Sequence, residues 1–308
     1  MADDWTRVVL EGGRISAGEA ASLELELFSA PDNLHARVRL LNRTPETSAR
    51  RNNHIFWFIE NRPEVRLHAH GFINQRDDPD AYGRAKQLWA NVIASRGDDT
   101  AVLRCASEFS VVNDKLLTEE LLRRGAALEP AEEYWRRRLG FLHSLVARRA
   151  DTPELRVQAA RVALAEYEAA LGLEMSTEAR YSLIIDAAEV ALLASDHARA
   201  TEYAERVLAE ASGFEDSWVY GNGIHHGHIV LGRVALASDD VAGAREHLAA
   251  AGATPGSPQL NSFGPDQNLA VELLARGERE AVLAYVAACQ QFCGRVLERI
   301  EAALDVPG

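Results

Sequence analysis

Cysteine is scarce in this chain. The 308 residues include three cysteines, Cys105, Cys289 and Cys293, which are unevenly placed. Such a set cannot supply a disulfide framework, so the sequence predicts a protein of a reducing compartment that has no disulfide. Cys289 and Cys293 lie four residues apart, on one face of a predicted helix. This spacing favours a buried apolar pair over a redox or metal site.

Long apolar runs are also absent. No segment approaches the roughly 18 to 20 apolar residues that a membrane-spanning helix needs. The chain begins MADDWTRVVL, with two acidic side chains and without the basic start and apolar core of a secretory signal. We therefore expect a cytoplasmic protein that has no membrane partner. The bias toward alanine, arginine, leucine and glutamate is typical of a GC-rich bacterial genome.

Basic residues are outnumbered. The chain has 33 lysines and arginines against 46 acidic residues, which gives a formal net charge of −13. Because this charge repels a phosphate backbone, we expect no nucleic-acid partner and favour a protein or peptide partner that is basic or neutral. Apolar residues make up 47% of the chain and charged residues 26%. This balance excludes a disordered chain.

Proline is absent between Pro153 and Pro255, where strong helix formers dominate. Their apolar positions follow a period of 3.6 residues, which predicts long helices. One helix is expected to end at Ser195, with Ser195 and Asp196 as caps for the next. The same break recurs 44 positions later, at residues 238–240. Two successive helix hairpins are therefore predicted to be nearly superimposable.

What the chain does have is a repeated spacing of small residues. A small residue is followed twelve positions on by another, then four further by a bulky residue and three further by a small one. Small residues at helix crossings allow close approach, so the pattern predicts an all-α fold of stacked antiparallel helix pairs. The best copies are Gly232-Ala244-Leu248-Ala251 and Ala188-Ala200-Ala204-Val207, and weaker copies start at Ala106 and Gly140.

These residues resemble the tetratricopeptide repeat family, whose 34-residue period separates Ala106 from Gly140. The resemblance extends over roughly residues 50 to 290, with several inserts. It implies a right-handed α-solenoid of about five or six helix hairpins, in which the first helix of each pair lines a concave groove that usually binds a peptide or protein. The predicted organisation is an N-terminal helix pair at 1–45, repeats at 46–292 and a capping helix at 293–308.

One predicted helix carries three histidines, His225, His226 and His228. His226 points well away from the other two, and no further ligand stands one turn on, so we expect no metal. Projection onto the repeat places His226 and Arg233 on the groove side and makes His228 a packing residue. Asn222 is four residues before His226 and can project with it.

A groove role is predicted for a set of mostly charged residues on the first helices. The arginines at 136–138 are expected to face Arg104 of the preceding pair. They can hold a partner's carboxylate or form ion pairs within the helix surface, and both interpretations stay open. The predicted groove residues are Arg104, Arg137, Asp186, Glu189, Asn222, His226 and Arg233.

Two further segments are rich in polar groups. Residues 49–64 start a helix with several donors, which form either a solvated first turn or a binding edge, and histidines at 68 and 70 follow in the next loop. The polar loop at 254–268 is long for a compact array and either covers the groove end near His226 or only redirects the chain. The secondary candidate residues are Asn52, Asn53, His54 and Asn261.

No phosphate-binding glycine loop, nucleophile elbow or paired metal-helix motif occurs in the sequence. We therefore expect no cofactor, and favour a non-enzymatic scaffold that binds a protein or peptide in its groove. The alternative is a small-molecule-binding protein or enzyme with a polar pocket around Asn222, His225 and His226. The loop at 254–268, with Asn261, would close that pocket.

Overall fold

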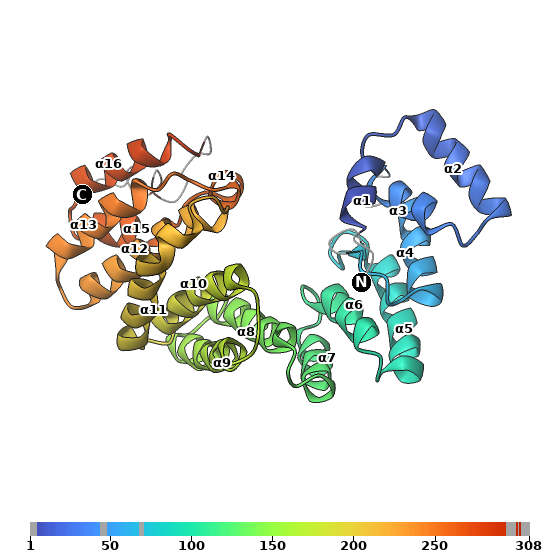
Figure 1. The fold of residues 1–308 in the computed structure, drawn as a ribbon, viewed down its shortest axis with the longest axis horizontal. Coiled ribbons are helices and arrows are strands. Elements are labelled where there is room, and N and C mark those ends of the chain that lie inside the picture. Colours follow the sequence, from blue (N-terminus) through green and yellow to red (C-terminus); the bar gives the residue numbers. More distant parts are fainter. Residues whose placement is uncertain (1–4, 44–47, 68–70, 294–299, 301, 303–308) are drawn as a thin grey trace. The chain divides into compact units, whose positions relative to one another are not determined.

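The computed structural model describes residues 5–43, 48–67, 71–293, 300 and 302, and its regular elements in these ranges are all helical (Figure 1). The all-α prediction is thus confirmed for the described residues. In chain order the elements are α1 (Thr6–Gly12), α2 (Ala17–Ser29), α3 (Leu34–Arg43), α4 (Ala49–Asn61), α5 (Pro79–Arg96), α6 (Thr100–Ser110), α7 (Lys115–Leu128), α8 (Glu133–Arg148), α9 (Pro153–Leu171), α10 (Thr177–Leu193), α11 (His197–Glu210), the 3₁₀ turn η2 (Ala211–Phe214), α12 (Val219–Ala237), α13 (Val241–Gly252), α14 (Pro258–Phe263), α15 (Asn268–Leu274) and α16 (Arg279–Cys289).

The helices pack mostly against their neighbours along the chain, which confirms the sequential packing of helix pairs. They form two compact units, unit 1 at Met1–Ala131 and unit 2 at Glu132–Gly308. Within the described residues, no helix is long and apolar enough to cross a membrane. The right-handed superhelix stays a prediction.

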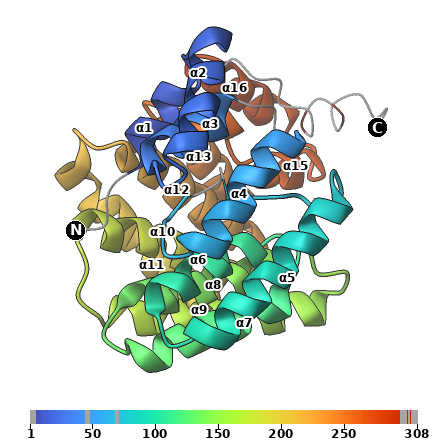
Figure 2. The same cartoon turned by 90° about the vertical axis from the view of Figure 1, so that its right-hand side faces the viewer.

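In unit 1, the segment for which a helix pair was predicted contains three helices, α1, α2 and α3, and α3 packs against both of the others. Next along the chain, α4 contacts α5, α5 contacts α6, and α6 packs along α7. Helices α4, α5 and α6 lie side by side in both views (Figures 1 and 2). Most of the predicted capping helix at 293–308 and the histidines at 68 and 70 lie outside the described residues.

Unit 2 is built from the hairpins α8–α9, α10–α11, α12–α13 and α15–α16. The first helix α10 also contacts α8 and α12, so three first helices adjoin one another. The small residues of the repeated spacing lie at the crossings: Ala200, Ala204, Ala244 and Ala251 are all fully buried. The repeated spacing therefore predicts the core of this unit correctly. Cys289 and Cys293 are buried free thiols, as their spacing indicated.

The predicted breaks between helices have one geometry in two hairpins. Ser195 and Asp239 adopt left-handed backbone conformations, with φ of 58° and 64°. The next residue in each case caps the following helix: Asp196 accepts from the backbone N–H of Arg199, and Asp240 from that of Gly243. A side-chain oxygen at this position satisfies an N–H that the first turn leaves free, which ends one helix and begins the next.

Candidate functional site

Three charged side chains from three first helices meet in unit 2. Glu189 of α10 lies between Arg148, at the end of α8, and His226 of α12. One carboxylate oxygen of Glu189 is 2.5 Å from an Arg148 terminal nitrogen, and the other is 2.6 Å from His226 Nδ1. These contacts join first helices only and do not involve the second helices α9 and α11, because α10 packs directly on α8 and α12. Glu189 and His226 are both predicted groove residues, and the structure brings them together, while their role in binding stays a prediction.

The charges of these three groups stabilise one another. Burial opposes ionisation of Glu189, but His226 and Arg148 together hold the pKa of the carboxyl well below its usual range. Burial also disfavours a charged His226, whereas Glu189 raises the pKa of the imidazole above its ordinary value. Glu189 raises the pKa of Arg148 as well. The chain Arg148–Glu189–His226 is therefore a network of ionised groups rather than of neutral hydrogen-bonding groups.

Asp186 stands one turn before Glu189 on α10, on the same side of the helix. The side chain is exposed to solvent, yet desolvation by the surrounding protein and repulsion from Glu189 raise its pKa to about 7. His226, Arg148 and Arg137 act in the opposite direction. Asp186 forms no hydrogen bond or ion pair with the residues that the structure describes. This carboxyl is therefore available to a ligand and changes its protonation near neutral pH.

Arg137, Arg148, Asp186, Glu189 and His226 are called the charged face below. Arg137 and Arg148 are eleven residues apart on α8, which is three helical turns and places both on one side. Arg137 is a predicted groove residue and Arg148 is not, although the sequence spacing of eleven already places Arg148 on the same side of the helix as Arg137. Arg137 Nε is 3.0 Å from Glu133 on the same helix.

The other predicted groove arginines are paired inside their own units. Arg233 of α12 makes a bidentate ion pair with Glu272 of α15: a terminal nitrogen donates to Oε1 at 2.7 Å and Nε donates to Oε2 at 3.0 Å. Arg104 lies in unit 1, where it is 3.4 Å from Glu129. Arg104 is in unit 1 and the arginines at 136–138 are in unit 2, so their predicted closeness stays a prediction.

The open question about the arginines at 136–138 has a structural answer for each side chain. Arg136 donates to Glu166 of α9 at 2.9 Å. The Arg138 guanidinium lies 5.0 Å from the centre of the Phe141 ring. With Arg137 beside Glu133, each of the three arginines has a partner within unit 2: a carboxylate for Arg136 and Arg137, and an aromatic ring for Arg138. Binding of a partner's carboxylate by these arginines stays a prediction.

Asn222 joins α12 to the loop at 254–268. The amide is almost fully buried; its oxygen accepts from the Ser257 hydroxyl and its nitrogen donates to Gln259, both at 2.5 Å. In the same region, the Thr254 hydroxyl donates to the backbone carbonyl of Gly221 at 2.8 Å. Hydrogen bonds therefore hold the loop against the first part of α12, and the predicted site residue Asn222 makes two of them.

His225 fixes the far end of this loop. The imidazole is completely buried. Its Nδ1 lies 3.1 Å from the Ala251 carbonyl, and its Nε2 accepts from the backbone N–H of Asp266 at 2.9 Å. These partners assign the neutral tautomer with hydrogen on Nδ1, and burial lowers the pKa of His225 to about 3. Both ring nitrogens are thus occupied in this structure.

Asn261 is exposed on α14, inside the loop. With its amide nitrogen turned toward two backbone carbonyls, it donates to Phe292 at 2.7 Å and to Ser257 at 3.1 Å. The Asn261 amide therefore supports the loop itself.

His228 is half-buried and packs against His247 of α13, with the two Nδ1 atoms 3.1 Å apart. This confirms the packing role predicted for His228, while the partner could not be foreseen. Burial lowers the pKa of both imidazoles. Among the residues that the structure describes, no group of three or more histidine, cysteine, aspartate or glutamate side chains is arranged to hold a metal ion.

The secondary candidates on α4 have mixed surroundings. Asn52 and His54 are buried, whereas Asn53 is exposed. Asn52 donates to Asp78 at 2.8 Å, and His54 Nε2 lies 3.3 Å from Glu24. The first turn of α4 is thus partly a buried polar junction rather than a solvated end.

Comparison with known proteins identifies no family for the chain. No protein-family model matches the sequence, and no curated protein is significantly similar to it. The structure itself shows an all-helical protein in which helix pairs pack in sequence, and this is the part of the repeat expectation that is confirmed.

Proposed function

We propose that unit 2 binds a protein or peptide through the charged face, as a non-enzymatic scaffold. The observation that carries this proposal is the meeting of charged side chains from α8, α10 and α12, with Asp186 exposed and unpaired among the described residues. A surface with alternating charges along several helices suits an extended partner, which presents charges and backbone polar groups at intervals.

An exposed aromatic ring extends this surface. Phe141 lies four residues after Arg137 and seven before Arg148, so all three occupy one side of α8. Phe141 is 38% exposed, and the Arg138 guanidinium lies 5.0 Å from the centre of its ring. Aromatic side chains commonly anchor an interface, with charged groups around them. The proposed partner thus places an apolar side chain on Phe141 and a basic or neutral segment along Asp186.

A selection of random displayed peptides on the full-length protein tests the proposal. The variant Phe141→Ala/Asp186→Ala removes the apolar anchor and the unpaired carboxyl. The matched control is Leu155→Ala/Glu210→Ala, which removes one exposed apolar and one acidic side chain from the second helices α9 and α11. Peptides selected on the natural protein should lose about 10-fold or more in affinity for the first variant only. Failure to select any peptide, or equal losses in both variants, would exclude this binding face.

One observation favours a small-molecule or enzymatic role as the second candidate. A carboxyl with a pKa of about 7, close to a histidine with a raised pKa, is an arrangement found at sites of proton transfer. Asn222 and His225, which this role was expected to use, are engaged by the loop at 254–268. A thermal-shift screen of metabolites tests the role, with the natural protein compared with Asp186→Asn. A compound that stabilises only the natural protein would favour this candidate.

A further inference from the structure

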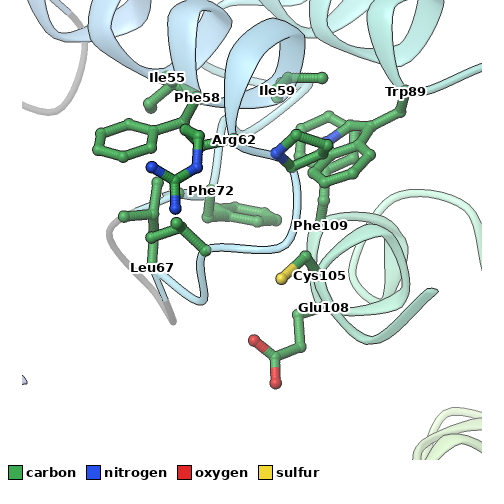
Figure 3. Close-up of a pocket in the computed structure, with 13 residues that line it drawn as sticks. Ile55, Phe58, Ile59, Arg62, Leu67, Phe72, Trp89, Cys105, Glu108 and Phe109 are labelled. Atoms are coloured by element: carbon green, nitrogen blue, oxygen red, sulfur yellow. The ribbon is translucent and has the colours of Figure 1, made fainter. Parts of the chain in front are cut away.

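Two hollows in the described part of unit 1 differ in size and lining. The first lies between α4, α5 and α6, where Phe58, Trp89 and Phe109 gather (Figure 3). Its room is about 40 Å³, which holds a few water molecules at most, so it is a gap in the core rather than a ligand site. The second hollow has room of about 230 Å³, somewhat less than sites for drug-sized ligands, and suits a smaller molecule. It lies between α2, α3 and α4, is called the arginine pocket below, and is lined by Glu24, Leu27, Phe28, Arg37, Arg50, Asn53 and His54.

Two buried side chains, Arg37 and His54, form the floor of the arginine pocket. Arg37 is 9% exposed and His54 is 4% exposed. Arg37 Nε donates to the Pro31 carbonyl at 2.8 Å, and the guanidinium lies 3.9 Å from the centre of the Trp57 ring. One terminal nitrogen of Arg37 is 3.4 Å from His54 Nδ1, and the other has no partner among the described residues. The guanidinium is therefore held in place while one of its nitrogens stays available to a ligand.

His54 is neutral at neutral pH and joins Arg37 to Glu24. Because a guanidinium can only donate, His54 Nδ1 accepts, and the ring hydrogen is on Nε2, which lies 3.3 Å from Glu24. Burial lowers the pKa of His54; Arg37 and Arg50 act in the same direction, and Glu24 opposes them. The floor of the pocket thus carries the positive charge of Arg37 and no second one.

Arg50 brings a positive charge to the edge of the pocket. Its side chain is exposed and forms no hydrogen bond or ion pair with the residues that the structure describes. Asn53, about one turn further along α4, is exposed as well, and its amide has no described partner either. Burial lowers the pKa of Arg37, while Asp32 and Glu24 raise it, so the charge of Arg37 already has acidic groups near it. Arg50 is the charge that remains to be balanced, which suits a ligand with one negative charge.

The remaining wall of the pocket is apolar and comes from α2. Leu27 is buried against α3, whereas its neighbour Phe28 is 86% exposed. An exposed aromatic ring that lines a pocket offers a large apolar surface to a ligand. The arginine pocket therefore combines guanidinium and amide donors with an apolar wall.

We infer that the arginine pocket binds a small organic carboxylate whose body is apolar. The carboxylate accepts from Arg50 and from the available nitrogen of Arg37, because charge-assisted hydrogen bonds from guanidinium groups to carboxylates are strong. The Asn53 amide is a further donor, and the body of the ligand packs on Leu27 and Phe28. Of the two interpretations of residues 49–64, this pocket supports the binding edge. The site is in unit 1 and is independent of the function proposed for the charged face.

The test follows small fluorinated probes by ¹⁹F NMR as full-length protein is added. The probes are 4-fluorobenzoate, the uncharged 4-fluorobenzamide of similar shape, and 4-fluorophenyl phosphate, which carries two negative charges at about pH 8. We expect 4-fluorobenzoate to bind in a saturable manner, about 10-fold or more tightly than the amide. We also expect it to bind at least as tightly as the phosphate, because the pocket has one charge to balance.

Two substitutions of exposed residues assign the binding to the pocket. Arg50→Gln should weaken 4-fluorobenzoate binding by about 5-fold or more and leave the amide unaffected. Phe28→Ala should weaken binding of both probes by about 3-fold or more, because it removes apolar contact area. The matched controls are Arg123→Gln and Leu116→Ala, which replace exposed side chains on α7, outside the pocket. Their affinities should equal those of the natural protein.

Four results would each overturn the inference. They are the absence of saturable 4-fluorobenzoate binding, equal affinity for benzoate and amide, tighter binding of the phosphate, and unchanged benzoate affinity in Arg50→Gln. Equal losses in the control variants would place the binding outside the arginine pocket and overturn it as well.

Discussion

Substitution of one glycine tests how the helix pairs of unit 2 are held together. Gly140 is in the middle of α8, the helix that packs along α9. A Cβ atom added at Gly140 would overlap the ring of Tyr167, which is 2% exposed in the core between α9 and α10. Gly83, in the first half of α5, has open space at the same atom: apart from its chain neighbours and its own helix backbone, no described atom lies within 4 Å.

The two alanine substitutions should have opposite signs. In both helices, replacement of glycine by alanine stabilises the helical backbone by about 1 kcal/mol. Gly83→Ala has no opposing cost, so we expect a gain of roughly 0.5 to 1 kcal/mol in the free energy of unfolding. At Gly140 the methyl group forces a buried ring to move, and overpacking of this kind costs about 1 to 3 kcal/mol or more. Because the overlap is with ring carbons held on all sides, we expect Gly140→Ala to destabilise the protein by about 1 to 2 kcal/mol.

Urea denaturation followed by circular dichroism measures both changes. Hydrogen exchange then assigns each change to a helix: amides of α8 and α9 should exchange faster in Gly140→Ala, and those of α5 more slowly in Gly83→Ala. If Gly140→Ala is as stable as the natural protein or more so, close helix approach is not what requires glycine there. The repeated spacing would then lose its physical explanation.

Two further predictions concern buried polar groups of unit 2. The free energy of unfolding should decrease as the pH falls below 6.5. The folded protein has lowered pKa values at His225, His228 and His247, so these imidazoles bind protons in the unfolded chain at a higher pH than in the folded protein. His225, with a folded pKa of about 3, contributes about 1.4 kcal/mol per pH unit, while the raised pKa of Asp186 opposes the trend. Melting temperatures that do not fall between pH 6.5 and 5 would contradict this. Separately, Asn222→Ala should cost about 1 to 3 kcal/mol and speed hydrogen exchange in residues 255–263, since it leaves the loop groups unpaired. Unchanged exchange there would show that other contacts hold the loop.

Much of the fold could be predicted because it depends on local rules. Helix formers with a period of 3.6, capping aspartates and small residues at fixed spacing give the helices, their ends and their pairing. Asp196 and Asp240 cap the helices as expected. The division into two units after Ala131 could not be foreseen, because it depends on which helices contact one another across long separations.

The charged face was partly predictable for the same reason. Asp186, Glu189 and His226 follow from their positions on the first helices, since periodicity determines which side of a helix a residue occupies. The pairing of Glu189 with Arg148, and the burial of His225, depend on distances between helices, which periodicity does not contain.

The left-handed residues Ser195 and Asp239 give two hairpins, α10–α11 and α12–α13, the same turn between their first and second helices. Each follows a first helix, and each is followed by an aspartate that caps the next helix. A recombination event that joins the chain at one turn to the chain at the other preserves both the backbone conformation and the cap. Removal or duplication of residues 196–239 therefore deletes or adds the second helix of one hairpin and the first helix of the next, so the number of hairpins changes by one while the turn keeps its geometry. The number of hairpins in such a chain is open to change by a single crossover.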